Sequence, residues 1–447
     1  MRISIYFLIV FCILQYTGFS QNWVEVGAGF DGDPRCTFVD TVSDLLYVGG
    51  TFKSSGSIRM RGIAKWDGSQ WDSLQSGIDD FNLSYPDPIN AIIKFQNKIY
   101  VGGSFATAGG ITVNGLGIWD GSQWDSLASG ISAQATVDCF KVLNGELYVG
   151  GTFNNVGGIT SHHIAKWDGS NWNGFNFGID STFGGVFTIE EFNGDLYVGG
   201  NILPASIRDL FVWDGSTVSP VGSGIQGGLA SISKMIVYNN ELYIAGYFTQ
   251  ADGNAGNCII KYDGNTLIDV GGGMDNRITD LKVHDGLLYA CGVFNHAGGI
   301  SANKIAVWNG VSWSALSNDL FDNNIEAMDF YHNELYVVGG FTKINNDSVN
   351  FIAKYTGQLG ISDLSKRSGF TITPNPTNTQ FTMSFSIPLA KDAMLVMMDS
   401  RGKEVARTLL EKSTNRKELD VHDFSTGIYF LILQTEIECL TGKLIIE

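Results

Sequence analysis

Residues 46–50 read Leu-Tyr-Val-Gly-Gly, and this short run decides the fold because it recurs along the chain. Seven copies follow one another, and successive tyrosines are separated by 46 to 53 residues. These tyrosines are Tyr47, Tyr100, Tyr148, Tyr197, Tyr243, Tyr289 and Tyr336. Self-similarity at this period is typical of chains built from repeated β-sheet units, each of which buries its apolar face against its neighbours.

A glycine stands three positions after every one of these tyrosines. The seven glycines are Gly50, Gly103, Gly151, Gly200, Gly246, Gly292 and Gly339. A strand position that repeatedly lacks a side chain predicts that another stretch of backbone approaches it closely.

The copies also contain Asn-Gly and Asp-Gly pairs, such as Asn144-Gly145 and Asp168-Gly169. Both residues of such a pair tolerate the positive φ that a type I′ hairpin turn requires. The second copy therefore predicts four strands, at residues 91–95, 98–105, 116–120 and 123–127. Four antiparallel strands per repeat form one blade of a β-propeller, so the sequence predicts an all-β fold with a seven-bladed β-propeller.

The last copy ends after its third strand, at Tyr355-Thr356-Gly357, whereas residues 23–27 provide an isolated strand of the fourth type. We expect this N-terminal strand to complete the seventh blade and close the ring. The run at residues 46–50, followed by Trp66 and Trp71, resembles the kelch motif. The resemblance covers about residues 22–359 and implies the fold; it leaves the function open, because such propellers serve many roles.

The formal net charge of −17 and the absence of a basic stripe exclude nucleic acid as an expected partner. Residues 1–20 combine Arg2, an apolar run from Ile3 to Leu14, and the small residues Gly18 and Ser20. This pattern predicts a signal peptide. No other apolar run approaches about 18 residues, so we expect no transmembrane segment after cleavage.

The mature chain contains five cysteines without the spacing of a zinc site: Cys36, Cys139, Cys258, Cys291 and Cys439. Cys258 and Cys291 fall on neighbouring repeats and could form a disulfide in an oxidising compartment. Five reduced thiols are the alternative, and the sequence does not choose between them.

Because the strands alternate in direction, the loops between the second and third strands share one end of the ring with the connectors between repeats. We expect this loop-rich face to bind ligands. Carboxylates and aromatic rings suit sugars, and carboxylates also suit Ca²⁺, although acidic loops often only solvate a surface. The candidate residues on this face are Asp31, Asp33, Asp79, Asp80, Tyr85, Asp87, Asp180, Asp275, Asp319 and Asp322.

No catalytic motif identifies an active site, and the sequence predicts no cofactor. Two Gly-x-Gly-x-x-Gly stretches, residues 27–32 and 222–227, are followed by strands where a dinucleotide site requires a helix. We expect a non-enzymatic binding or adhesion protein for a carbohydrate or a protein. The alternatives are a polysaccharide-active hydrolase or lyase that uses loop carboxylates over the channel, and an architectural surface protein.

A different pattern begins after a polar linker at residues 360–369. It runs from Pro374-Asn375-Pro376 through Gly427-Ile428-Tyr429 to Lys443-Leu444-Ile445-Ile446, and its alternation predicts a small C-terminal β-sandwich over residues 370–447. These motifs resemble the type A sorting domain of the type IX secretion system. The resemblance implies recognition by that machinery and a secreted or outer-membrane surface location.

Overall fold

A computed structural model of the chain describes residues 22–447, except for 79–87, 128–129, 133–134, 176, 178–183, 203–208, 223, 228–229, 252–253, 358, 360–369, 386–388, 390–391, 400–402 and 435–438. The predicted signal peptide and linker therefore lie outside the described residues. All named elements of the described part are β-strands. Within that part, no helix is long and apolar enough to cross a bilayer.

Residues 23–355 contain seven four-stranded antiparallel sheets among the described residues. In six of them the strands follow in chain order from one edge to the other. The first three are β2 (Pro34–Asp40), β3 (Leu45–Gly50), β6 (Ile63–Trp66) and β7 (Trp71–Ser73); β8 (Ile89–Phe95), β9 (Lys98–Gly103), β12 (Leu116–Trp119) and β13 (Trp124–Ser126); and β14 (Thr136–Leu143), β15 (Glu146–Thr152), β18 (Ile164–Trp167) and β19 (Trp172–Gly174).

The next three sheets have the same order. They are β20 (Gly184–Phe192), β21 (Asp195–Ile202), β22 (Leu210–Trp213) and β23 (Val218–Pro220); β25 (Ser231–Tyr238), β26 (Glu241–Tyr247), β29 (Ile259–Tyr262) and β30 (Leu267–Asp269); and β31 (Ile278–His284), β32 (Leu287–Gly292), β35 (Ile305–Trp308) and β36 (Trp313–Ala315).

The seventh sheet joins the two ends of this region. It contains β37 (Ile325–Tyr331), β38 (Glu334–Gly339), β41 (Ile352–Tyr355) and β1 (Trp23–Glu25). β1 pairs antiparallel with β41, with Trp23 opposite Tyr355, which is the pairing that the sequence predicted. Trp23 is fully buried, and its ring lies 4.9 Å from that of Tyr355 and 5.1 Å from that of Phe321.

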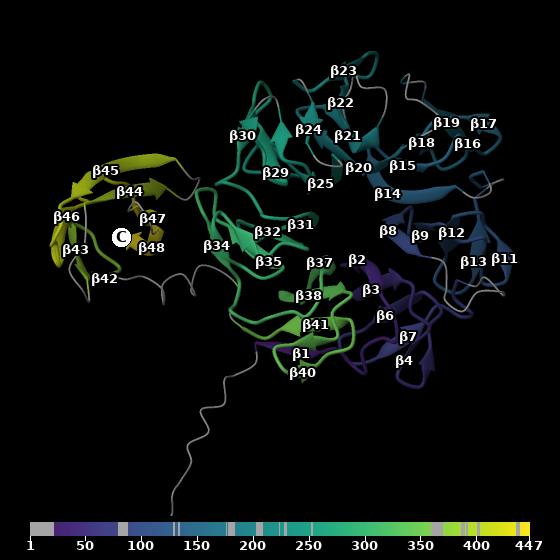
Figure 1. Cartoon of the computed structure of the whole chain (residues 1–447), viewed down its shortest axis with the longest axis horizontal. Coiled ribbons are helices and arrows are strands. Elements are labelled where there is room, and N and C mark those ends of the chain that lie inside the picture. Colours follow the sequence, from purple (N-terminus) through teal and green to yellow (C-terminus); the bar gives the residue numbers. More distant parts are fainter. Residues whose placement is uncertain are drawn as a thin grey trace, which may run out of the picture.

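The seven sheets stand around a common centre, with the first strand of each sheet innermost (Figure 1). Each innermost strand contacts the next, in the order β2, β8, β14, β20, β25, β31 and β37, and β37 also contacts β2. Four-stranded antiparallel sheets arranged in this way fit the blades of a β-propeller. The four strands predicted for the second copy are confirmed as β8, β9, β12 and β13.

A β-bulge near the start of each innermost strand explains the repeated glycine. In β14 the bulge falls between Val137 and Cys139, and the other six innermost strands shift register at the equivalent place. A Cβ atom added to Gly151 would lie 2.0 Å from the carbonyl oxygen of Thr136, and the other six glycines face an equivalent carbonyl at 2.0 to 2.4 Å. The predicted close approach of backbone is confirmed.

The connections between second and third strands are more ordered than the open loops that we expected. Six sheets carry a short hairpin there, and Gly109 and Gly110 at one tip have the positive φ of a type I′ turn. The hairpins are β4 (Ser54–Ser55) with β5 (Ile58–Arg59), β10 (Thr107–Ala108) with β11 (Ile111–Thr112), β16 (Asn155–Val156) with β17 (Ile159–Thr160), β27 (Gln250–Ala251) with β28 (Asn254–Ala255), β33 (His296–Ala297) with β34 (Ile300–Ser301), and β39 (Lys343–Ile344) with β40 (Asp347–Ser348). A further strand, β24 (Ile225–Gln226), pairs with β27.

The C-terminal region forms two sheets over one core. The first contains β42 (Phe370–Thr373), β43 (Gln380–Phe385) and β46 (Arg416–Asp420); the second contains β45 (Glu404–Leu410), β44 (Ala393–Asp399), β47 (Gly427–Gln434) and β48 (Cys439–Ile446). Phe381 of the first sheet packs in one apolar cluster with Leu431 of the second, as a β-sandwich requires.

Among the five cysteines after residue 21, four have described side chains, and all four are free thiols. Because Cys258 and Cys291 are both free, the disulfide considered from the sequence is not formed between them. Cys439 lies on β48.

Candidate functional site

Three of the predicted ligand-face acids hold the short hairpins in place. The carboxylate of Asp31 accepts hydrogen bonds from the backbone N–H groups of Lys53 and Ser54, at 2.7 and 2.9 Å, and from the Ser54 hydroxyl at 2.7 Å. The equivalent acids make the same contacts with the hairpins of the sixth and seventh sheets: Asp275 with Asn295 and His296, and Asp322 with Thr342 and Lys343.

These hydrogen bonds favour the ionised carboxylates. Burial raises their pKa, but the backbone and side-chain donors outweigh it, so the pKa values of Asp31, Asp275 and Asp322 lie below the ordinary value. Such carboxylates are well suited to ordering a surface and poorly suited to donating protons near neutral pH.

The other predicted face residues divide into two groups. Asp33 is exposed, and Asp319 accepts hydrogen bonds from the side-chain amides of Asn22 and Asn345 at 3.1 and 2.8 Å. The remaining five lie outside the described residues and stay predictions: Asp79, Asp80, Tyr85, Asp87 and Asp180.

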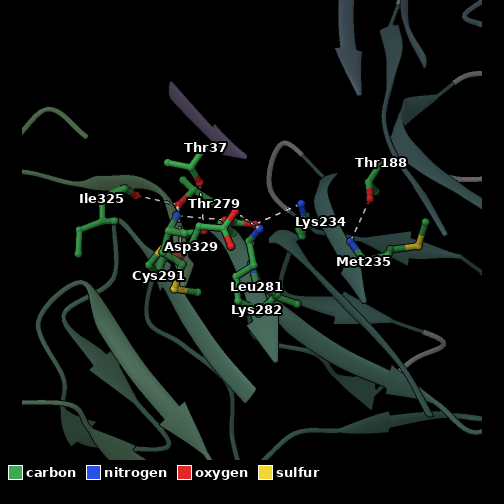
Figure 2. A network of polar contacts seen from close by, with 12 residues as sticks. Thr37, Thr188, Lys234, Met235, Thr279, Leu281, Lys282, Cys291, Ile325 and Asp329 are labelled. Atoms are coloured by element: carbon green, nitrogen blue, oxygen red, sulfur yellow. Dashed lines mark hydrogen bonds and ion pairs between the residues drawn. The ribbon is translucent and has the colours of Figure 1, made fainter. Parts of the chain in front are cut away.

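A second candidate site lies at the centre of the ring of sheets. A cavity of about 360 Å³ is lined by residues of all seven innermost strands. Figure 2 shows part of its polar lining, where Lys282 and Asp329 meet beside Thr279 and Lys234 approaches from the neighbouring strand. The Thr279 hydroxyl donates to the carbonyl oxygen of Ile325 at 2.7 Å and so joins β31 to β37.

Charged groups around this cavity are largely paired across neighbouring strands. Lys234 lies 3.3 Å from Asp280, and Lys282 lies 2.9 Å from Asp329. Asp280 is 5% exposed and also accepts a hydrogen bond from the backbone N–H of Met328 at 3.1 Å. Burial lowers the pKa of Lys282, but the carboxylates of Asp329 and Asp280 raise it above its ordinary value. These pairs bind adjacent sheets together electrostatically.

Asp138 on β14 differs from these paired acids. Burial raises its pKa from 3.8 to about 6, against the effect of a hydrogen bond that the Asn90 side chain donates at 2.8 Å. Asp138 lines the central cavity, and a carboxyl that titrates near pH 6 can exchange protons under physiological conditions.

The thiols near the cavity are poor nucleophiles and poor metal ligands. Burial raises the pKa of Cys36 to about 12 and that of Cys291 well above its ordinary value. Within the described part of the chain, no group of three or more His, Cys, Asp or Glu side chains is arranged to hold a metal ion.

None of the residues that line the cavity was predicted as a candidate ligand residue. A signal was present for Lys234 and Asp280, which stand two positions after the apolar start of their innermost strands, where the other five copies have Cys, Ala or Thr. Asp138 stands one position after that start, where other copies also have charged residues such as Arg35 and Glu326, so its position gives no such signal.

We expect the free energy of unfolding to fall as the pH rises from about 4 to about 6, because the folded protein holds the Asp138 proton more tightly than the unfolded chain. Asp138→Asn should remove this contribution and leave a flatter profile, as measured by urea unfolding at a series of pH values. Asn90→Ala, which removes the bond favouring ionisation, should extend the fall to higher pH. An unchanged profile in Asp138→Asn would contradict the assignment.

In the C-terminal region, the two ends of the sandwich are joined by one side chain. Asn375 donates from its side-chain amide to the carbonyl oxygen of Lys443 at 2.6 Å and accepts at 2.8 Å from the backbone N–H of Ile445. Thr377 also lies opposite Ile446 in a parallel bridge. The opening Pro-Asn-Pro motif therefore fixes the position of the closing Lys-Leu-Ile-Ile strand.

Residues 371–447 match the family described as the secretion system C-terminal sorting domain. This sorting domain indicates export by the type IX secretion system, with the protein secreted or attached to the cell surface. It also implies an interaction with the secretion machinery. The resemblance noted in the sequence is thus confirmed for the sorting domain.

The remaining comparisons concern the whole chain. No curated protein matches it. Among solved structures, it is similar to the β-propeller domain of the Trilobed protease from Pyrococcus furiosus, which is described as having an open velcro topology. The identity is 11%, the TM-score is 0.41, and the match covers 74% of this chain and 96% of that chain.

Asn375→Ala should loosen the closing strand of the sorting domain. Loss of two backbone contacts should speed hydrogen–deuterium exchange at the Ile445 amide by about tenfold or more, because each net hydrogen bond is worth roughly 1 kcal/mol. Asn378→Ala, on the same segment, is the control and should leave this exchange unchanged. Equal exchange in the two variants would show that Asn375 does not hold the strand.

Proposed function

We propose that this chain is an exported, kelch-like, closed seven-bladed propeller whose loop-rich face binds a carbohydrate or another protein outside the cell. The pairing of β1 with β41 and the contact between β37 and β2 support the closed ring. The sorting domain supports a location where such ligands occur. A rigid ring that presents connectors at one end is a suitable scaffold for recognition.

The observation that carries the binding role is the fixed arrangement of the described connector acids. Asp31, Asp275 and Asp322 have lowered pKa values, and each accepts hydrogen bonds from two backbone N–H groups and contacts one side chain, which orders the face and does not suit proton donation. Asp79 and Asp180 occupy the equivalent repeat position. We include Asp79 and Asp180 among the residues proposed to bind the ligand.

The connector of the first repeat is the favoured contact region. Ile78 and Ile89 are 11 positions apart, whereas the equivalent Met274 and Ile278 are 4 apart. The inserted stretch contains Asp79, Asp80, Tyr85 and Asp87, a mixture of carboxylates and an aromatic ring that suits sugar hydroxyls and ring faces. Ca²⁺ could contribute through the same carboxylates.

The test is binding of the purified mature chain to a panel of glycans and envelope polysaccharides, with and without Ca²⁺, while product release is monitored. Saturable binding without products supports the proposal. The triple variant Asp79→Ala, Asp80→Ala, Tyr85→Ala should weaken binding by about tenfold or more. Asp125→Ala, an exposed acid on β13 away from the connectors, is the control. Unchanged binding in the triple variant would remove these residues from the site.

A polysaccharide-active hydrolase or lyase is the second candidate, favoured by one observation. The pKa of Asp138, raised to about 6, suits a general acid or base at the central cavity beneath the loop carboxylates. Product release that is abolished by Asp138→Asn would support this candidate over the binding role. Neither glycan binding nor product release would be expected of the third alternative, an architectural surface protein.

A further inference from the structure

Paired tryptophans close the outer edge of most sheets. A tryptophan at the end of the third strand contacts one at the start of the fourth, with ring centroids 5.0 to 5.5 Å apart. The pairs are Trp66 with Trp71, Trp119 with Trp124, Trp167 with Trp172, and Trp308 with Trp313. The third-strand member of each pair is at most 8% exposed.

In three of the four pairs the second tryptophan also ties its sheet to the preceding one; the buried indole N–H of Trp172 has no such bond. The indole N–H of Trp124 donates to the carbonyl oxygen of Leu74 at 3.0 Å, and Leu74 follows the fourth strand of the sheet before it. Trp71 and Trp313 make equivalent bonds to Val26 and Val270. The pair therefore seals the junction between the outer strands of adjacent sheets.

The fourth sheet lacks this tryptophan pair. Opposite Trp213 stands Val218, so the second indole is missing and Trp213 is only half-buried. The fifth sheet also lacks the second tryptophan, but there Leu267 is 3% exposed and fills the position. The gap is thus particular to the junction between the third and fourth sheets.

Two phenylalanines follow the third sheet at this junction. Phe175 takes the position that Leu74 has in the first repeat, and Phe177 lies two positions further on. Their rings stack on each other at 4.7 Å and 26°, and that of Phe175 meets Trp213 edge-on at 5.1 Å and 76°. The three rings therefore form one aromatic cluster, and together with Val218 they line a pocket at the position of the missing tryptophan pair.

The result is a pocket of about 500 Å³, within the usual range for small-molecule sites. Its described lining residues include no charged side chain: Gly174, Phe175, Phe177, Trp213, Gly215, Ser216 and Val218. Gly215 has open space where a side chain would stand, so a ligand can approach the backbone closely there. Ser216 adds a hydroxyl, which donates to the carboxylate of Asp214 at 2.8 Å and can accept a hydrogen bond from a ligand.

We propose that this pocket binds one ring of an uncharged saccharide. Aromatic faces pack against the C–H face of a sugar, while a hydroxyl and nearby backbone groups exchange hydrogen bonds with its hydroxyls. Among the described lining residues, none offers a charged side chain to pair with an anionic or cationic sugar. This inference rests on the proposed function and adds a specific site to it, on a junction of outer strands separate from the first connector.

The experiment restores the tryptophan pair that the other sheets have. Val218→Trp should fill the pocket and abolish binding of neutral methyl glycosides to the mature chain, as followed by saturation-transfer difference NMR. Val218→Leu is the matched control and should retain binding. Phe177→Leu, which removes a ring but keeps apolar volume, should weaken binding by about tenfold or more and serves if Val218→Trp does not fold.

The outcomes separate this inference from the proposed function. Saturation transfer that is lost in Val218→Trp and weakened in Phe177→Leu but retained in the first-connector triple variant supports the pocket. Binding that persists in a folded Val218→Trp, or that is undiminished in Phe177→Leu, overturns the pocket and leaves carbohydrate binding elsewhere on the protein intact. Absence of any glycoside or polysaccharide binding in the wild type overturns both the pocket and the carbohydrate part of the proposed function.

Discussion

Replacing Trp23 by alanine is expected to lower the free energy of unfolding by about 3–5 kcal/mol, the usual cost of truncating a buried tryptophan. The ring is fully buried between Phe321 and Tyr355. It is the main apolar anchor of β1, a strand of three residues whose ladder partner is β41. Weakening it should therefore also expose the edge of β41.

Chemical denaturation followed by circular dichroism measures this effect. Val24→Ala is the control, because Val24 belongs to the same strand but is 40% exposed, and it should change the free energy of unfolding by less than about 0.5 kcal/mol. Similar small losses in both variants would mean that β1 contributes little to the seventh sheet.

Gly151→Ala should cost about 3 kcal/mol or more, at the upper end for overpacking. The new methyl group would lie 2.0 Å from the carbonyl oxygen of Thr136 and 3.0 Å from the Cα of Val137, and both are backbone atoms at the bulge of β14. Neither atom can rotate away as a side chain would, so the bulge itself must shift.

Gly145→Ala provides the comparison within the same hairpin. Gly145 has a φ of +78° and open space around its position, so the substitution should cost only the strain of a left-handed backbone, about 1 kcal/mol. Thermal unfolding of the two variants should rank Gly151→Ala as clearly less stable. Equal stability would show that the bulge yields without penalty.

The positions of many strands could be predicted from the sequence because they depend on turn residues and glycines that recur from repeat to repeat. The hairpin pairs such as Asn144-Gly145 locate turns, and the recurring glycine locates the close backbone contact. The ordered hairpins on the loop-rich face were not predicted. Their strands have only two residues each, too few for an alternating pattern to be visible, as in β10 and β11.

The site was harder to predict because its contacts join distant parts of the chain. Asp31 was interpreted as a candidate ligand residue from its loop context, but its donors lie 22 and 23 positions away in the next hairpin. The raised pKa of Asp138 depends on burial among seven strands, which no local motif encodes. The half-buried Trp213 is revealed only when Val218 is seen opposite it.

The pairing of Trp23 with Tyr355 also constrains how this protein can mature. A chain that emerges N-terminus first exposes β1 early, yet the partner of β1 is formed from one of the last segments of the sheet region to emerge. Until then β1 remains an unpaired strand with a large aromatic side chain. Completion of the seventh sheet is thus a late event, and a partly exported chain would lack it.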